Sequence, residues 1–422
     1  MINSNLSAET LTLNLRQKSR SKWVADFAKT QILKRLRLLH TGHLVLIEGM
    51  ERYSFGSEGN ISATITVHDP RFYGEIAFGG SIGAGEAYML GYWSASNLTD
   101  VIRLMCLNQS VMDSLEGGYQ WLTKPLMKVL HWLNSNTAEG SRKNIAAHYD
   151  LGNDMFGLFL DSTMMYSSAI FNGYTHTLRA ASELKLKTIC DKLQLKPTDH
   201  VIEIGTGWGG FAIYAATHYG CKVTTTTISK QQYELAKQRV IESGLQDKIT
   251  LLLEDYRNLQ GHYDKLVSIE MIEAVGYQFY DTYFAKVGTL LKPNGLALIQ
   301  AITIADQRYE SAKKSVDFIQ RYIFPGSCIP SNTAMLNSIT KTSDLRLFDL
   351  EDIGPHYATT LRIWRENFFV NIEAVRKLGY SEEFIKMWEF YLCYCEGGFA
   401  ERALGDVHLL LAKPENRRAA LI

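Results

Sequence analysis

Glycines at the spacing G-x-G-x-x-G follow an apolar run in the stretch V-I-E-I-G-T-G-W-G-G, from Val201 to Gly210. Gly205, Gly207 and Gly210 occupy the glycine positions of that pattern, which lets a backbone approach a ligand closely where a helix begins. A dinucleotide site also needs an acidic residue about 20 positions further on, to bind the ribose hydroxyls. The next apolar run ends in T-T-I-S at 226–229, without a carboxylate, so we interpret the loop as the site of another adenosine cofactor.

Two carboxylates near this loop fit S-adenosylmethionine. Glu203 precedes the loop, and Asp255 follows the third apolar run, where its carboxylate can accept a hydrogen bond from an adenine amino group. Ser229 and Gln232 form the pattern S-x-x-Q, which predicts a capping box where the next helix begins. Together these residues favour S-adenosylmethionine over a dinucleotide.

The chain around these groups alternates between apolar runs and amphipathic stretches. The predicted strands are 201–204, 222–228, 249–253, 265–270 and 296–304, and the predicted helices are 211–219, 231–242 and 280–291. This alternation predicts an α/β fold with a mostly parallel sheet and helices on both of its faces. In such a sheet the ligand lies at the carboxyl ends of the strands, so the glycine loop and Asp255 are expected at one edge.

The N-terminal part has a different pattern. With 422 residues the chain is long enough for two domains. Residues 42–92 predict short strands and turns, 97–133 a mostly helical segment and 134–143 a polar linker. We therefore expect a smaller mixed N-terminal domain at 1–133 and a larger Rossmann-like α/β domain at 144–422 that binds S-adenosylmethionine.

Composition narrows the class of protein. The formal net charge is zero, which argues against a nucleic-acid-binding protein that relies on bulk electrostatics. The six cysteines are scattered and form neither a disulfide framework nor a zinc-site spacing, so we expect free thiols, a cytoplasmic location and no metal. Neither a signal peptide nor an apolar run long enough to cross a bilayer is evident, so the protein is expected in solution or on a membrane surface.

The neutral total hides a basic segment between Arg16 and Arg37. This segment holds eight Lys and Arg residues against Asp26 alone, a charge of +7, and aromatic and leucine side chains are interleaved with the cations. A basic helix of this kind can bind anionic lipid headgroups. The alternative is a solvated helix packed on its own domain, because the charges do not segregate to one helical face.

A series of motifs in chain order carries a resemblance to a known family. The motifs are H-Y-D-L-G-N-D (148–154), M-Y-S-S-A (165–169), E-I-G-T-G-W-G-G (203–210), T-I-S-K-Q-Q (227–232), E-M-I-E-A-V-G (270–276), D-F-I-Q-R-Y-I-F-P-G (317–326) and C-E-G-G-F (395–399). The chain resembles the cyclopropane-fatty-acyl-phospholipid synthase family, which includes the mycolic acid cyclopropane synthases. The match runs from about His148 to the C-terminus, with a weaker fit at 85–93.

The resemblance implies an S-adenosylmethionine-dependent C-methyltransferase. Such an enzyme transfers a methyl group to a cis double bond of an unsaturated phospholipid acyl chain and forms a cyclopropane fatty acid. The resemblance also implies a homodimer that is peripheral on the inner membrane surface. The alternatives are a methyl- or methylene-branching fatty acid methyltransferase, a small-molecule methyltransferase, and a binding protein without activity.

The motifs also imply which residues bind the cofactor. The implied S-adenosylmethionine contacts are Tyr166, Ser167, Gly205, Thr206, Gly207, Thr227, Gln232, Asp255 and Tyr256. Each residue type also has a structural alternative, since a tyrosine can be a core aromatic and a threonine can simply suit a strand.

In this family a bound bicarbonate is thought to remove the proton that leaves the substrate, and backbone N–H groups, a glutamate, a histidine and a tyrosine hold it. Glu273 and Tyr357 match the glutamate and the tyrosine, and Ile302 matches a backbone donor. Ser168 stands where the family has cysteine, and Gln300 stands in place of the histidine. These departures put the use of bicarbonate in doubt.

Glu270 departs from the family pattern most, because it occupies a position that is usually glycine. A bicarbonate about 4 Å from an ionised Glu270 would be repelled by roughly 4 kcal/mol at an effective dielectric of about 20. We hypothesise that the Glu270 carboxylate replaces bicarbonate as the base; the alternatives are a protonated Glu270 and a structural role. Cys395 matches a C-terminal cysteine that has been an active-site candidate in this family, and a small buried residue is the equal alternative.

Overall fold

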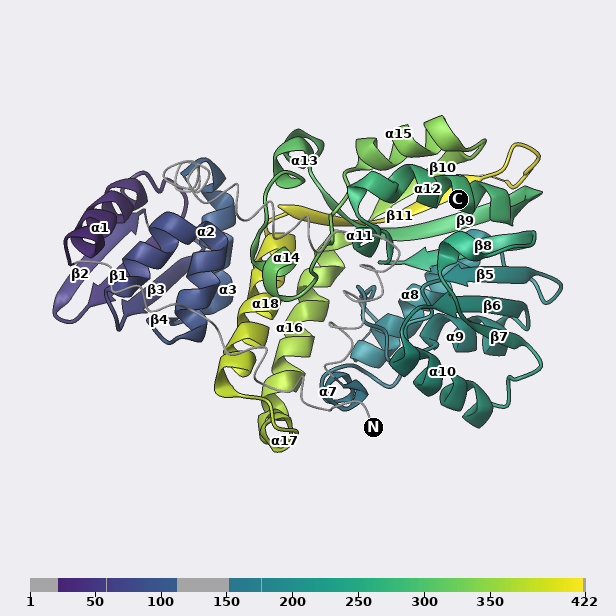
Figure 1. Cartoon of the computed structure of the whole chain (residues 1–422), viewed down its shortest axis with the longest axis horizontal. Coiled ribbons are helices and arrows are strands. Elements are labelled where there is room, and N and C mark those ends of the chain that lie inside the picture. Colours follow the sequence, from purple (N-terminus) through teal and green to yellow (C-terminus); the bar gives the residue numbers. More distant parts are fainter. Residues whose placement is uncertain (1–21, 58, 112–151, 176, 420–422) are drawn as a thin grey trace.

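The computed structural model describes residues 22–57, 59–111, 152–175 and 177–419, which form two sheets with their helices (Figure 1). Several predictions from the sequence lie outside these residues. They are the polar linker, the boundary between the two expected domains, the first cations of the basic segment and the beginning of the H-Y-D-L-G-N-D motif.

The N-terminal part contains a mixed four-stranded sheet in the order β2-β1-β3-β4. Its strands are β1 (His43–Glu48), β2 (Glu51–Gly56), β3 (Ser62–Val67) and β4 (Trp93–Ala95), and its helices are α1 (Lys22–Leu36), α2 (Arg71–Met89) and α3 (Leu98–Leu107). β1 pairs with β3 in parallel, and the other neighbouring strands are antiparallel. This sheet confirms the prediction of a smaller mixed fold ahead of the larger sheet.

α1 carries the described part of the basic segment and packs on its own domain. Ala28, Ile32 and Leu36 are buried in the core. Lys29 forms ion pairs with Glu48 and Glu51 at 2.6 and 2.7 Å. These contacts favour the packed-helix interpretation for this stretch, and contact of the segment with lipid stays a prediction.

α2 corrects the prediction of strands and turns throughout residues 42–92. The helix spans 71–89 and contains glycines that lower helix propensity, including Gly80, where φ of +56° and ψ of −133° interrupt the helix. Tertiary packing overrides that propensity, because α2 packs against α1 on one side and α18 (Glu382–Ala400) on the other.

The larger sheet has seven strands in the order β10-β11-β9-β8-β5-β6-β7. The strands are β5 (His200–Ile204), β6 (Lys222–Thr227), β7 (Ile249–Leu253), β8 (Tyr263–Ile269), β9 (Leu291–Ile304), β10 (Arg346–Asp352) and β11 (Leu404–Ala412). β9, β8, β5, β6 and β7 are parallel to one another, and β11 is antiparallel to both β9 and β10. This arrangement confirms the mostly parallel α/β fold, and the chain order reverses between β5 and β8, where ligands bind in such sheets.

Helices cover both faces of this sheet (Figure 1). The helices in this part of the described chain are α7 (Asn153–Gly157), α8 (Leu178–Leu193), α9 (Gly210–His218), α10 (Lys230–Glu242), α11 (Ile272–Val275), α12 (Tyr280–Leu290), α13 (Asp306–Ala312), α14 (Phe318–Tyr322), α15 (Asn332–Thr342), α16 (Gly354–Val370), α17 (Ile372–Lys377) and α18, with short 3₁₀ turns η2 (Tyr256–Asn258) and η3 (Tyr277–Phe279). α9, α10 and α12 confirm the three predicted helices to within one residue at each end. No helix among the described residues is both long and apolar enough to cross a bilayer.

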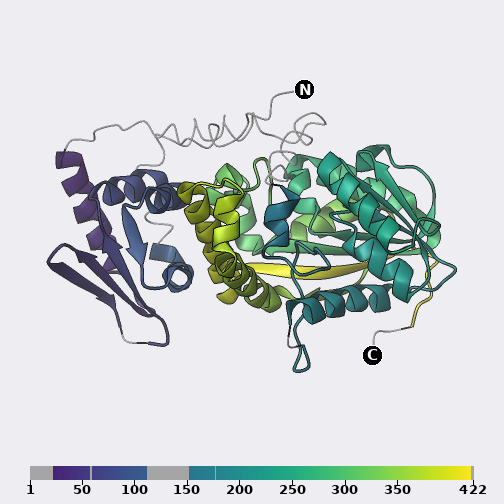
Figure 2. The ribbon, with the colours of Figure 1, turned by 90° about the horizontal axis from the view of Figure 1, so that it is seen from below.

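α16 and α18 lie between the two sheets in both views (Figures 1 and 2). α18 packs against α3, and a Cβ atom at Gly397 of α18 would lie only 2.7 Å from a side-chain carbon of Ile102. The glycine of the C-E-G-G-F motif therefore permits close contact between these helices. Arg103 of α3 donates to Glu401, just after α18, at 2.7 Å, and Tyr88 of α2 donates to Glu389 of α18 at 2.8 Å.

Candidate active site

The glycine loop after β5 has the conformation that a close ligand requires. φ is +101° at Gly205 and +52° at Gly207, where a side chain would be strained. The N–H groups of Gly205 and Thr206 donate to the Thr226 carbonyl of β6 at 3.1 and 2.9 Å, so the loop is fixed to the sheet. A Cβ atom at Gly207 would have no neighbour within 4 Å, because this backbone faces the open space of a cavity. The loop thus fits a cofactor held against its main chain.

All nine predicted cofactor contacts line that cavity, which has a volume of about 620 Å³. Thr227 donates its hydroxyl proton to the Gln232 side chain at 2.8 Å, and the Ser229 hydroxyl accepts from the Gln232 N–H at 3.3 Å. Ser229 therefore caps α10 as predicted. The predicted reciprocal half of the capping box does not form, because the Gln232 side-chain oxygen accepts from Thr227 instead.

Asp255 has a partner that the sequence did not indicate. Arg257 donates to its carboxylate through the guanidinium at 2.8 and 2.6 Å and through its backbone N–H at 2.9 Å. This pairing fixes the orientation of the Asp255 carboxylate in the cavity wall. The neighbouring Tyr256 ring also lines the cavity and packs edge-on against Tyr283.

Tyr166 and Ser167 form another part of the cavity wall. The Tyr166 hydroxyl is 2.8 Å from the Tyr391 hydroxyl of α18. Ser167 accepts from the fully buried Lys185 of α8 at 2.7 Å. Burial lowers the pKa of Lys185 to about 8, against the attraction of the Glu270 carboxylate. Lys185 is thus a cationic group close to the site that sequence reasoning missed.

Glu270 follows β8 directly and holds a backbone conformation that is uncommon for a side chain of its type, with φ of +46°. Its backbone N–H donates to the Gln300 carbonyl of β9 at 2.8 Å. Its carboxylate accepts from the Ser168 N–H at 2.8 Å, from the Gln300 amide at 2.7 Å and from the Tyr357 hydroxyl of α16 at 2.6 Å. Three donors from separate segments therefore fix this carboxylate.

These three donors belong to the residues that the family resemblance assigned to an external anion. The structure brings them together, but around the carboxylate of Glu270. Ser168 and Gln300 contact Glu270 without lining the cavity, whereas Glu270 and Tyr357 line it. In this structure the three donors are therefore bound to a carboxylate of the chain itself.

Glu273 lies three residues further on, in α11, and has a different environment. One of its oxygens accepts from the Ile302 N–H at 2.5 Å, and the other is buried without a hydrogen-bond partner among the described residues. Burial, and then the charge of Glu270, raise the pKa of Glu273 to about 8. Glu273 is therefore mostly protonated at neutral pH.

The Gln300 amide also connects Glu270 to residues that the sequence analysis did not select. Its second N–H donates to Asp406 at 2.9 Å, and its carbonyl oxygen lies 3.3 Å from a ring nitrogen of His408. Asp406 and His408 are fully buried on β11. Two polar residues at i and i+2 in the otherwise apolar run G-D-V-H-L-L-L were the available signal, since residues two apart share one face of a strand.

Burial raises the pKa of Glu270, and the Tyr357 hydroxyl, the Lys185 charge and the Ser168 N–H oppose that rise. Burial and the nearby Glu270 carboxylate raise the pKa of Asp406 well above its usual range. Within this pair Asp406 therefore has the stronger tendency to hold a proton, and the three donors favour the charged form of Glu270.

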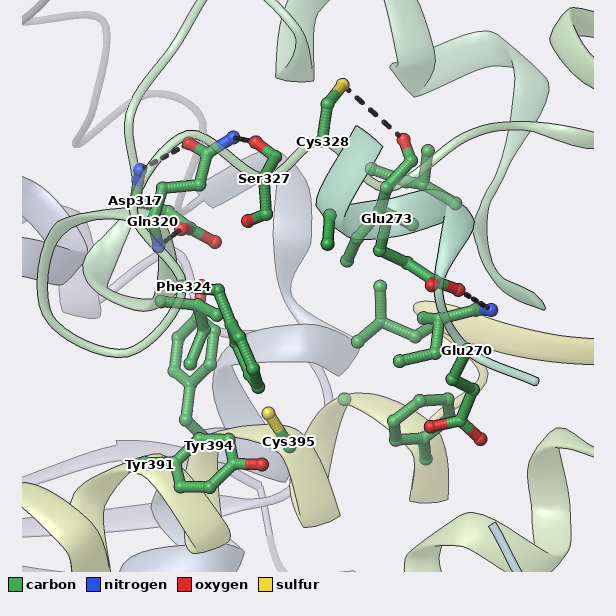
Figure 3. A pocket seen from close by; sticks show the side chains of 18 of the residues that line it. Glu270, Glu273, Asp317, Gln320, Phe324, Ser327, Cys328, Tyr391, Tyr394 and Cys395 are labelled. Atoms are coloured by element: carbon green, nitrogen blue, oxygen red, sulfur yellow. Dashed lines mark hydrogen bonds between the residues drawn. The ribbon is translucent and has the colours of Figure 1, made fainter. Parts of the chain in front are cut away.

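Figure 3 shows how the cavity walls face one another. Glu270 and Glu273 lie on one side, Tyr391, Tyr394 and Cys395 point in from α18, and the Asp317 segment closes a further side. Burial raises the pKa of the Cys395 thiol, so this cysteine is an uncharged wall group and not a thiolate nucleophile.

The family model of the mycolic acid cyclopropane synthetases matches residues 136–409 of the chain. The chain belongs to this family. Relatives extend the match toward the N-terminus. The tuberculostearic acid methyltransferase UfaA1 of Mycobacterium tuberculosis is 40% identical over 76% of this chain and 76% of its own length. The cyclopropane-fatty-acyl-phospholipid synthase of Escherichia coli is 37% identical over 84% of this chain and 89% of its own.

Solved structures agree with this assignment. The cyclopropane synthase MmaA2 from Mycobacterium tuberculosis superposes with a TM-score of 0.60 and 29% identity, over 64% of this chain and 98% of its own. The mycolic acid cyclopropane synthase CmaA1, solved in complex with SAH and CTAB, gives the same values. The family member described here is thus an S-adenosylmethionine-dependent methyltransferase, and its glycine loop fits that cofactor.

Proposed function

We propose that this enzyme methylates a cis double bond in an unsaturated phospholipid acyl chain and forms a cyclopropane fatty acid, with Glu270 as the base. The observation that carries the proposal is the carboxylate of Glu270, which lines the cavity beside the cofactor loop and accepts from Ser168, Gln300 and Tyr357.

The residues of the cavity suit the charge that such a reaction generates. Bound S-adenosylmethionine supplies an electrophilic methyl group on a sulfonium centre. When one carbon of the double bond takes up that methyl group with the π electrons, the other carbon becomes cationic. The ionised Glu270 and the aromatic faces of Tyr166 and Tyr391 stabilise this cation. Loss of a proton from the new methyl group to Glu270 leaves the C–H electron pair to close the ring.

Glu270 serves as this base without an external anion. Its three hydrogen bonds use the donors that would otherwise hold a bicarbonate. Glu273 and Asp406 have raised pKa values and hold their protons, so neither adds a second negative charge beside it. A positioned carboxylate of this kind contributes roughly 10²–10⁴-fold to the rate.

A second candidate product is a methyl- or methylene-branched chain, because the same base can remove a different proton. Glu270 is attached to the end of β8, so its position relative to the substrate cation decides which proton leaves. If Glu270 removes a proton from a chain carbon next to the cation, a methyl-branched alkene forms with the same mass as the cyclopropane. A methylene branch forms if a hydride first moves from the methylated carbon to the cationic carbon and the new methyl group then loses the proton. The relative UfaA1 is named as a methyltransferase of tuberculostearic acid, which supports this candidate.

The test is incubation of the enzyme with S-adenosylmethionine labelled in its methyl group and vesicles of unsaturated phospholipid. We expect label in the extracted lipid, and proton NMR of that lipid to show ring protons far upfield. Labelled lipid without ring protons, with branched-alkene signals distinct from those of the substrate, would select the second candidate. Retention of all label in water-soluble compounds would contradict both products and favour a small-molecule methyltransferase or a binding protein.

We also propose that the enzyme acts at the surface of an anionic bilayer, as a homodimer. Lys34 and Arg37 are exposed at the C-terminal end of α1 and support the first part. Cosedimentation with anionic vesicles should decrease when both are replaced by glutamine, whereas neutral vesicles should show no change. Sedimentation velocity of the enzyme alone tests the dimer, and a monomer at assay concentration would contradict it.

A further inference from the structure

The cavity of the active site continues from the methyltransferase part into the N-terminal domain. Beyond Tyr391 and Cys395 of α18, its walls are formed by α1, α2 and α3 and by strands β1, β3 and β4 of the smaller sheet. Representative lining residues are Ile76, Ala84, Trp93, Ile102, Met105 and Cys106. One continuous space therefore connects the reaction centre with the interior of the N-terminal domain; this extension is called the N-terminal arm below.

The wall of the N-terminal arm differs chemically from the rest of the cavity. None of the described N-terminal residues that line it carries a charge. The methyltransferase part contributes carboxylates and cations to the same space, among them Asp255, Arg257 and Glu270. A phosphate or another charged group in the arm would lose its hydration without a partner, whereas a hydrocarbon chain would leave water at no such cost.

The fold keeps this space open. The interruption at Gly80 divides α2, and both Gly80 and the adjacent Ser81 line the arm. The polar bonds from α2 and α3 to α18 fix the arm to the methyltransferase part, and Thr99 adds a bond to Glu396 of α18 at 3.1 Å. The arm is thus held in a constant position relative to Glu270.

We propose that the N-terminal arm binds the methyl-terminal segment of the acyl chain whose double bond is methylated. Two observations indicate a hydrocarbon segment as the occupant: the arm is continuous with the reaction centre, and its wall is uncharged. This inference rests on the proposed lipid substrate. The charged headgroup stays outside the arm, so the chain enters with its methyl end first. The distance from the methyl end to the double bond then decides which double bond reaches Glu270.

Photocrosslinking tests this placement without relying on turnover. The probe is a phosphatidylcholine whose acyl chain carries a diazirine at its methyl end, irradiated in vesicles with the full-length enzyme. We expect labelled peptides from α2 and α3, with Met105 and Cys106 among the modified residues. The inference is overturned if the label appears only at residues 152–419 while the same preparation methylates phospholipid. Absence of both label and methylation would instead contradict the proposed function.

A matched pair of variants tests the length dependence. Met105→Trp adds bulk inside the arm, and Met50→Trp makes the same change at a fully exposed residue between β1 and β2. Oleoyl chains have two more methylene groups beyond the double bond than palmitoleoyl chains. We expect Met105→Trp to lower kcat/KM for oleoyl phospholipid by roughly tenfold relative to palmitoleoyl phospholipid, because pocket size discriminates by about that factor.

The expected control results are an unchanged substrate ratio in Met50→Trp and unchanged S-adenosylmethionine affinity in both variants. An equal loss for the two phospholipids in Met105→Trp, with the cofactor still bound, would overturn the inference. If Met105→Trp fails to fold, the crosslinking result alone decides, because it uses the unmodified enzyme.

Discussion

Two walls of one cavity differ in how they are built. On the methyltransferase side, Glu270, Asp255 and Thr227 each have fixed hydrogen-bond partners. On the N-terminal side, the described lining residues are uncharged, and side chains such as Ile76 and Met105 contribute only their surface. The first wall suits groups that must be oriented for chemistry, and the second suits a chain that needs only to be held out of water. Separate parts of the chain therefore orient the reacting groups and retain the rest of the substrate.

The largest effect is expected at the centre of the polar wall. Glu270→Gln keeps the shape of the side chain but removes the base, so the rate should fall by roughly 10²–10⁴-fold with the cofactor still bound. Glu273→Gln is the matched control, since burial keeps Glu273 mostly protonated below pH 8, and its loss should be much smaller. Single-turnover assays with vesicles measure both rates. An equal loss of rate in the two variants would contradict the assignment of Glu270, and not Glu273, as the base.

Asp255→Ala tests the cofactor end of the polar wall. Loss of a charge-assisted hydrogen bond should weaken S-adenosylmethionine binding by roughly 1.5–3 kcal/mol, measured by calorimetric titration. Arg257→Met leaves Asp255 in place without its guanidinium partner and should have a smaller effect. If the Arg257 variant loses as much affinity as Asp255→Ala, Asp255 acts through its position and not as a direct acceptor.

The contact that joins the two walls is tested by Gly397→Ala. The added carbon would lie 2.7 Å from Ile102, and overpacking of this kind costs about 1–3 kcal/mol, partly offset by the better helix propensity of alanine. Gly398→Ala is the neighbouring control, because its added carbon would lie 3.3 Å from the end of the Leu404 side chain. Denaturant unfolding should show a lower midpoint for the first variant alone. A midpoint at or above that of the unmodified enzyme would contradict the close contact.

Tyr357→Phe should have the smallest effect on the rate, and this effect should depend on pH. The Tyr357 hydroxyl opposes the rise in the pKa of Glu270, so its removal raises that pKa further. The base is active when deprotonated, so the rising limb of the pH–rate profile should move to higher pH. The rate should fall roughly tenfold below the limb and recover above it. A loss that is the same at every pH would show that Tyr357 contributes in another way.

The two walls also differ in how well the sequence predicts them. The strands on either side of the glycine loop were predictable because alternating apolar runs are local, and the motif positions of Glu270, Ser168 and Tyr357 were recognisable by resemblance. The sequence led to the hypothesis that the Glu270 carboxylate replaces bicarbonate as the base, but it did not predict that Ser168, Gln300 and Tyr357 donate to that carboxylate.

Other features had no local signal. Asp406 meets Gln300 only because β11 pairs with β9, a long-range pairing that no local pattern specifies. Arg257 lies two residues from Asp255, but only the 3₁₀ turn η2 turns its guanidinium back onto that carboxylate. α2 was predicted as strands and turns because its glycines mask a helix that packing stabilises. The N-terminal arm has no motif, since uncharged side chains that line a cavity resemble those that fill a core.

The central claim is that the carboxylate of Glu270 replaces an external anion as the base. The most direct measurement is the rate of methyl transfer to phospholipid vesicles in carbonate-free buffer, with and without added bicarbonate, for the unmodified enzyme. We expect the same rate with and without bicarbonate, because the Ser168, Gln300 and Tyr357 donors are already bound to Glu270. Strong stimulation by bicarbonate would contradict it.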